Sequence, residues 1–114
     1  MLYHHEIGFP AAMRMPQRAF LLEYTQHTRS EAQGDRYGAF ALPMALDTRK
    51  ATLIEAEVDE TTGEIIKAVW RLRYDDTRDV VLVVLMRERT VKTVWINTRD
   101  DGHETLDKSR YTRP

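Results

Sequence analysis

The stretch KATLIEAEVDETTGEIIKAVWRLRYDDTRDVVLVVLMRERTVKTVWIN, residues 50–97, decides the fold that we expect for this chain. It holds runs of alternating apolar and polar residues that are separated by short turns such as ETTGE (60–64) and DDTR (75–78). A period of two is typical of β-strands with one buried face, and short turns join antiparallel neighbours. The stretch therefore predicts a four-stranded antiparallel meander sheet over residues 50–98.

The alternation also assigns the two faces of this sheet. In the second strand, one face would be core and would carry Ile66, Ala68, Trp70, Leu72 and Tyr74, while the other would carry Lys67, Val69, Arg71 and Arg73. The run DVVLVVLM (79–86) is apolar at both parities, as in a central strand covered on both faces. Trp70 and Trp95 fall on the core parity. If the faces were reversed, both would form an aromatic contact surface.

Residues 1–49 are expected to cover one face of the sheet. Thr25 suits a helix N-cap and Gly34 a helix stop, so a short helix is predicted near residues 26–33. The segment QRAFLLEY (17–24) fits either a short helix or an added strand, and PMALD (43–47) fits a single helical turn. We predict one α+β domain, residues 1–114, in which short N-terminal helical elements pack on the sheet and residues 99–114 form a polar tail.

The composition of the chain excludes several kinds of functional site. The chain has 114 residues, a formal net charge of −1 and no cysteine, which excludes a disulfide framework and a thiol nucleophile. The adjacent His4 and His5 would point to opposite faces of a strand, so we expect no metal site and no cofactor. The N-terminus lacks a secretory signal pattern and no apolar run is long enough to cross a bilayer, which predicts a cytoplasmic protein with no membrane partner.

The tail HETLDKSRY (103–111) gathers a histidine, hydroxyl groups and cations, and a second histidine lies in the predicted helix. Metal-independent cleavage of RNA needs such groups, because protons must move and the phosphorane must be stabilised. The catalytic candidates are His27, His103, Thr105, Ser109 and Tyr111, and the substrate-binding candidates are Arg71, Arg73, Lys108 and Arg110. We expect the tail to fold back along the sheet with Leu106 as its anchor. It would then meet the helix over a shared cationic hollow.

Glu55 and Glu57 leave two interpretations open. One glutamate could act as acid or base beside a histidine. Alternatively, both could form cross-strand ion pairs with Lys67, Arg71 or Arg73 on the solvated face.

Several segments carry a resemblance to a known group of proteins: YTQHTRSEA (24–32), DRYG (35–38), LIEAEVD (53–59), VLVV (81–84), VKTVWIN (91–97) and the tail (103–111). Together, over about residues 22–112, they resemble small phage and prophage proteins whose plan is similar to the barnase, colicin and RelE-like ribonuclease toxins. The resemblance implies a metal-independent endoribonuclease with its site on the open sheet face. It places His27, His103, Thr105, Ser109 and Tyr111 in that site and adds Arg36 as a phosphate-binding residue.

Two function classes follow. The first is an endoribonuclease-like phage protein that cleaves RNA with the help of histidine. The alternative is a non-catalytic, phage-encoded binding protein that inhibits or sequesters a host protein with the same fold. RNA, a host protein or an antitoxin are the partners that these classes imply, and exposed strand edges would also allow a homodimer.

Overall fold

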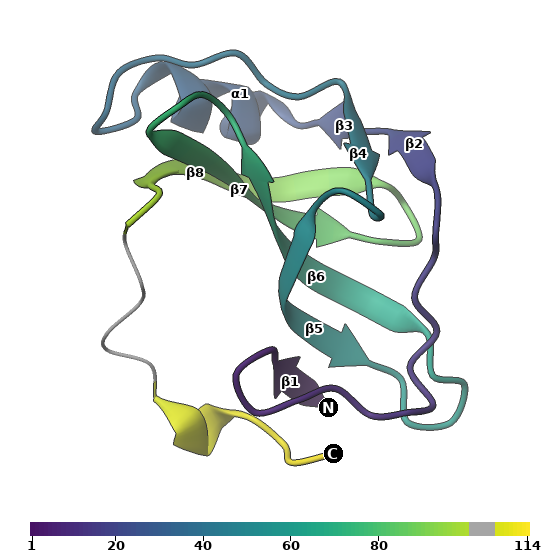
Figure 1. Cartoon of the computed structure of the whole chain (residues 1–114). Helices are drawn as coiled ribbons and strands as arrows, with labels where there is room; N and C mark the ends of the chain where they lie inside the picture. The colour runs from purple at the N-terminus through teal and green to yellow at the C-terminus, as the bar shows by residue number, and fades with distance from the viewer. Residues whose placement is uncertain (101–106) are drawn as a thin grey trace.

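The structure is a computed structural model that describes residues 1–100 and 107–114, so the candidates His103 and Thr105 and the expected anchor Leu106 lie outside the described residues. The class is α+β, mostly strands with one α-helix among the described residues (Figure 1). The strands are β1 (Leu2–His4), β2 (Ala19–Leu21), β3 (Glu23–Tyr24), β4 (Ala45–Asp47), β5 (Thr52–Val58), β6 (Ile65–Arg73), β7 (Arg78–Leu85) and β8 (Thr90–Thr98). The helix is α1 (Gln26–Gln33), and a 3-10 turn, η1 (Lys108–Arg110), lies near the C-terminus.

The main sheet has six strands in the order β1-β5-β6-β7-β8-β3. Strands β5 to β8 pair with their sequence neighbours in antiparallel fashion, but the predicted four-stranded antiparallel sheet is wrong as a description of the whole. The short strand β1 adds to one edge, and β3 adds to the other edge parallel to β8, which makes the sheet mixed. The N-terminal region thus supplies both edge strands; β3 lies in the segment 17–24, for which an added strand was one of the two expectations, whereas β1 was not predicted.

A second sheet of two strands, β2 and β4, lies over one face of the main sheet (Figure 1). The segment 17–24 is therefore added strand rather than helix. The helical turn predicted at 43–47 is wrong, because Ala45–Asp47 pairs antiparallel with β2 and places Leu46 opposite Phe20. The prediction of several N-terminal helical elements is corrected likewise, since α1 is the only α-helix that the described part of the chain contains.

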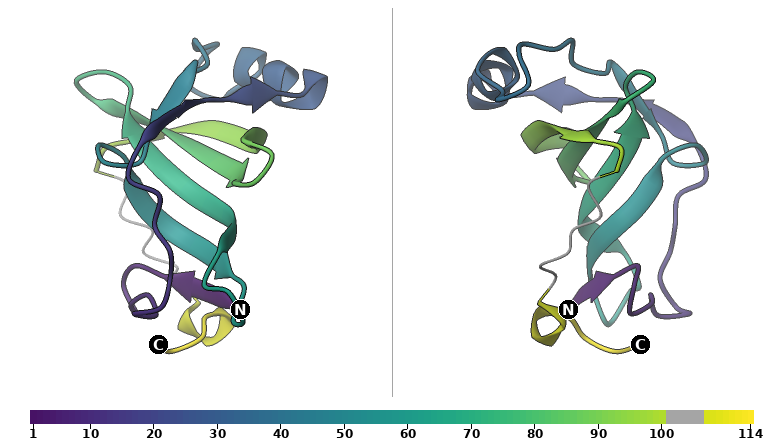
Figure 2. Two further views of the ribbon diagram at one scale, coloured as in Figure 1. Left: turned by 90° about the vertical axis from the view of Figure 1, so that its right-hand side faces the viewer. Right: turned by 60° about the vertical axis from the view of Figure 1, so that its left-hand side comes forward.

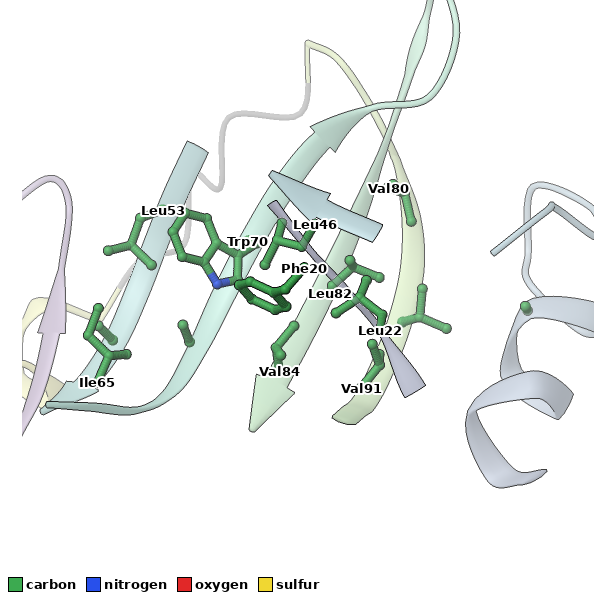
Figure 3. Close-up of a cluster of buried hydrophobic side chains, with 14 of the residues drawn as sticks. Phe20, Leu22, Leu46, Leu53, Ile65, Trp70, Val80, Leu82, Val84 and Val91 are labelled. Carbon is green, nitrogen blue, oxygen red and sulfur yellow. The ribbon is translucent and has the colours of Figure 1, made fainter. Parts of the chain in front are cut away.

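The core fills the space between the two sheets. Phe20 and Leu46 point from β2 and β4 toward Trp70 and Leu82 on the main sheet (Figure 3). Leu46, Trp70 and Leu82 are fully buried. Burial of such side chains is the main favourable contribution to folding, of the order of 1.5–3 kcal/mol each.

Irregular registers change the faces that strict alternation predicts. The register of β5 on β6 shifts between Leu53 and Glu55, and Leu53 is buried while Thr52 is exposed. Near the other end of this pair, Ile65 is buried and Ile66 is 44% exposed, because a further shift lies between Glu57 and Val58. An extra residue on one strand moves the side chains that follow it to the opposite face of the sheet from the one that strict alternation predicts.

A register shift of the same kind explains why only one of the two tryptophans lies in the core. Trp70 is buried in the core, as its parity predicts. The pairing of β7 with β8 shifts between Val83 and Val84, so Val94 and Ile96 are buried in the core and Trp95 is only half-buried. The assignment of Trp95 to the core face is therefore wrong.

Helix α1 begins and ends where its capping residues predict. The Thr25 hydroxyl accepts a hydrogen bond from the Thr28 amide at 3.2 Å, and Gly34 is the C-cap. The buried Thr28 hydroxyl donates to the Val91 carbonyl at 2.9 Å, which attaches the helix to the edge of β8. No helix in the described ranges combines the length and the apolar character that a membrane span requires.

Candidate functional site

The predicted catalytic residues do not gather in one place. His27 lies in the first turn of α1 at one end of the molecule, whereas η1 and both chain termini lie at the opposite end (Figures 1 and 2). Ser109 and Tyr111 are therefore far along the sheet from His27. The shared hollow that we expected between the helix and the tail is not formed by the described residues.

The side chain of His27 is exposed, and its imidazole lies beside another residue of the same helix. Its Nε2 lies 3.7 Å from Oε1 of Glu31, one turn further along α1, and its side chain is 76% exposed. Pairs of residues four apart on a helix surface are neighbours and contribute a few tenths of a kcal/mol. This contact is of the ordinary helix-surface kind, and it does not direct the imidazole toward the tail.

Arg71 belongs to an ion-pair network on the sheet. Its Nε lies 2.7 Å from Oδ2 of Asp79, and its Nη2 donates to the Thr98 carbonyl at 2.9 Å. Arg99 donates to the other carboxylate oxygen of Asp79 from Nε and Nη2, both at 3.1 Å. The side chains of Arg71 and Asp79 are only 13% and 12% exposed. The guanidinium of Arg71 is thus fixed by its contacts with Asp79 and with the Thr98 carbonyl.

The other two predicted arginines lie elsewhere. Arg73 pairs with Asp76 at 3.3 Å, and both side chains are well exposed. Arg36 follows α1, and its guanidinium lies 4.8 Å from the centre of the Tyr37 ring. Neither arginine has a hydrogen bond or an ion pair with residues 107–114, the described end of the tail, so these candidates do not form one phosphate site with Lys108 and Arg110.

The described part of the tail docks on the N-terminal edge of the sheet. Asp107 accepts hydrogen bonds from the amide and the hydroxyl of Ser109, at 3.0 and 2.6 Å, and so caps η1. The Thr112 amide donates to the Leu2 carbonyl at 2.7 Å. Lys108 and Arg110 are exposed on this turn, and Arg110 lies over the Tyr111 ring at 5.6 Å.

Of the predicted catalytic residues that the structure describes, Tyr111 has the most extensive set of contacts. Its phenol donates to Oε1 of Glu55 at 2.5 Å, and its ring centre lies 4.8 Å from that of the buried His4. Burial, followed by the hydrogen bond to Glu55, raises the pKa of Tyr111 to about 12. Glu55 therefore contacts the tail, and among the described residues it does not form the cross-strand ion pair that was one of its two interpretations. A polar cluster of Tyr111, Glu55 and His4 joins the tail to β1 and β5.

A cavity of about 410 Å³ lies on a different part of the surface. Four arginines line it together with one carboxylate and a group of mainly apolar side chains. We call it the arginine groove and define it by Arg14, Met15, Pro16, Arg18, Phe20, Glu64, Ile65, Met86, Arg87 and Arg89. The excess of cations is local, because the whole chain has a net charge of −1.

Most of the charge in the arginine groove is not neutralised. Arg87 forms a two-fold contact with Glu64, from Nε to Oε1 at 3.2 Å and from Nη2 to Oε2 at 2.8 Å. Within the described ranges, Arg14, Arg18 and Arg89 form no ion pair with a carboxylate. Arg18 and Arg89 instead lie over the Phe20 ring, at 5.9 and 5.4 Å from its centre.

Three segments that are far apart in the sequence form this groove. Two of them pack closely together because Gly63 has no side chain. The Arg14 amide donates to the Gly63 carbonyl at 2.8 Å. Gly63 has a φ of +77°, and a Cβ built there would lie 2.2 Å from the Ala12 carbonyl oxygen. The absent side chain thus lets the segment before β2 pack against the turn between β5 and β6, which carries Glu64.

Sequence reasoning missed the groove because its arginines lie in a loop before β2 and in the turn between β7 and β8 rather than on one strand or helix. The only local signals are two arginine pairs, RMPQR (14–18) and RER (87–89), which are far apart in the chain. Comparisons of the chain with protein-family models, with curated proteins and with solved structures found no match. Among the described residues, no group of three or more histidine, aspartate or glutamate side chains is arranged to hold a metal ion.

Proposed function

We propose that this protein is a non-catalytic binding protein that holds a polyanionic partner in the arginine groove. One observation carries the proposal: three of its four arginines lack a carboxylate partner among the described residues while lining a cavity. Uncompensated guanidinium groups in a concave site attract anions and form strong, charge-assisted hydrogen bonds with them.

Retention on an immobilised polyanion tests this function. The parent protein should bind heparin resin at low salt, and Arg18→Gln and Arg89→Gln should each elute at lower salt, because fewer cations contact the polymer. The control is Arg29→Gln, since Arg29 is also exposed and also lies over an aromatic ring, that of Tyr24. Equal elution of all three variants would contradict the proposal, as would failure of the parent to bind.

The endoribonuclease predicted by the resemblance is the second candidate function. The contact of Tyr111 with Glu55, beside the His4 ring, favours it because these groups can donate and accept protons. Its test is incubation of the purified protein with total RNA in the presence of a chelator. Cleavage that His27→Ala, His103→Ala or Tyr111→Phe abolishes would establish the enzyme, whereas intact RNA in every reaction would exclude it.

A further inference from the structure

We infer that the partner of the arginine groove is single-stranded nucleic acid, bound through its phosphates and one unpaired base. This inference rests on the proposed polyanion-binding function and names the ligand class. It concerns residues outside the set that the sequence predicted as a ribonuclease site.

The first step is the chemistry of the charged groups. All the cations of the groove are arginines. A guanidinium is planar, stays charged, and presents a fork of donors that matches two phosphate oxygens at once. Arg14, Arg18 and Arg89 are exposed at the surface, so their donors are accessible to a ligand. A phosphodiester chain that crosses the groove would therefore meet several such donors.

The second step is the position of two guanidinium groups over one aromatic ring. The Phe20 ring is buried, and Arg18 and Arg89 both lie over it. Cation–π contact of this kind restricts a long side chain and so lowers the entropy cost of binding. Unpaired bases stack on guanidinium planes as well as on aromatic rings. The pair of arginines thus offers a preformed surface on which a base can stack.

The third step is the apolar part of the wall. Met15, Pro16, Ile65 and Met86 line the same cavity as the arginines. A planar base has two apolar faces and gains from contact with such side chains, whereas a carboxylate side chain or a bare phosphate chain does not. The combination of cations with an apolar wall favours a nucleotide chain over an acidic peptide or an inorganic polyanion.

The base must be unpaired to enter. A cavity of about 410 Å³ is within the range of small-ligand sites. In a duplex the bases are stacked and paired, so only the backbone would reach the arginines. We therefore expect single strands to bind more tightly than a duplex of the same sequence.

Fluorescence anisotropy tests this with labelled single strands of about 10 nucleotides, a typical site size for one small domain. The probes are RNA, DNA of the same sequence, the corresponding duplex, an abasic strand, polyphosphate and polyglutamate. RNA or DNA should bind at least about tenfold more tightly than the abasic strand, since stacking of one base contributes roughly that factor. The ratio of RNA to DNA affinity reports whether the 2′-hydroxyl is recognised.

Substitutions locate the site. Arg18→Gln and Arg89→Gln should each weaken binding about tenfold and reduce the slope of log Kd against log salt by about 0.7, the value for one phosphate contact on a single strand. Arg29→Gln should change neither quantity. A loss with Arg29→Gln equal to the loss with Arg18→Gln would overturn the assignment of the groove.

The outcomes separate this inference from the proposed function. If the abasic strand or polyphosphate binds as tightly as RNA and DNA, the groove is a general anion site and the nucleic-acid inference fails. If polyglutamate binds most tightly, the partner is an acidic protein segment, which also overturns it. If no probe binds, both the inference and the proposed function fail.

Discussion

At the scale of single residues, Tyr111 offers a direct test of tail docking. Burial and the hydrogen bond to Glu55 raise its pKa from 10.0 to about 12. The folded state therefore keeps the neutral phenol at pH values where the unfolded chain has lost the proton. Its contribution to stability is complete below about pH 10 and is lost as the pH rises toward about 12.

The measurement is the phenolate absorbance of the parent minus that of Tyr111→Phe, followed as the pH rises. The difference isolates one of the five tyrosines and should titrate near 12. A midpoint of the difference near 10 would mean that the phenol is solvated and the tail is not held by Glu55.

Asp79 is the second residue whose environment makes a prediction. It is 9% exposed and accepts hydrogen bonds from both Arg71 and Arg99. Asp79→Asn leaves two guanidinium groups without their counter-charge, so it should lower the free energy of unfolding by about 3 kcal/mol. Urea denaturation measures this change.

The control for this change is Asp76→Asn. Asp76 forms a surface ion pair with Arg73, and its side chain is 100% exposed. Such pairs contribute little, so this variant should differ from the parent by less than about 0.5 kcal/mol. Similar midpoints for the two variants would show that the Asp79 network is not a structural ion cluster.

At the scale of elements, the sequence predicted those helices and strands that depend mainly on interactions between residues close in the chain. Thr25 and Gly34 mark the ends of α1 because a cap satisfies backbone groups within a few residues of itself. The long strands β6, β7 and β8 were likewise visible in their apolar runs. The type and position of α1 and of these three strands were therefore accessible from the residues alone.

Features that depend on packing were not accessible in this way. The strands β2 and β4 have only three residues each, too few for a periodic pattern, and they exist because Phe20 and Leu46 complete the core. The register shift beside Val84 leaves Trp95 only half-buried, although alternation along its own strand assigned it to the core face. The arginine groove was missed for the same reason, since its side chains meet only after the chain has folded.

Gly63 makes the prediction that belongs to this scale. Gly63→Ala would place a methyl group 2.2 Å from the Ala12 carbonyl oxygen, in a backbone conformation with φ of +77°. The strain and the clash together should lower the free energy of unfolding by more than about 1 kcal/mol and should displace the segment that carries Arg14. Urea denaturation and retention on heparin resin measure the two effects.

Gly38→Ala is the matched control for the energetic cost of a side chain on a residue with positive φ. Gly38 also has a positive φ, +94°, but a Cβ there meets nothing within 4 Å. It should therefore show the cost of the conformation without the clash, and it should leave polyanion binding unchanged. If both variants lose stability equally and neither changes retention, close packing at Gly63 does not position the groove.

At the scale of the whole molecule, two sheets of unequal size share one core. The strands β2 and β4 are too short to be stable by themselves, because an isolated two-stranded unit is marginal in water. Their buried side chains belong to the same cluster as Trp70 and Leu82 (Figure 3). The arginine groove lies at the margin of this arrangement, since Phe20 contributes both to the core and to the groove wall.

This architecture predicts that the two sheets unfold together. Leu46→Ala removes a fully buried side chain from β4 and should cost about 2–5 kcal/mol. Leu21→Ala is the control, because Leu21 lies on the paired strand β2 but is 70% exposed, and its change should stay within about 0.5 kcal/mol. If the sheets form one cooperative unit, tryptophan fluorescence and far-ultraviolet circular dichroism will give the same midpoint for Leu46→Ala. Separate midpoints would mean that β2 and β4 detach first, in which case Phe20 could not hold Arg18 and Arg89 in the arrangement that the nucleic-acid inference requires.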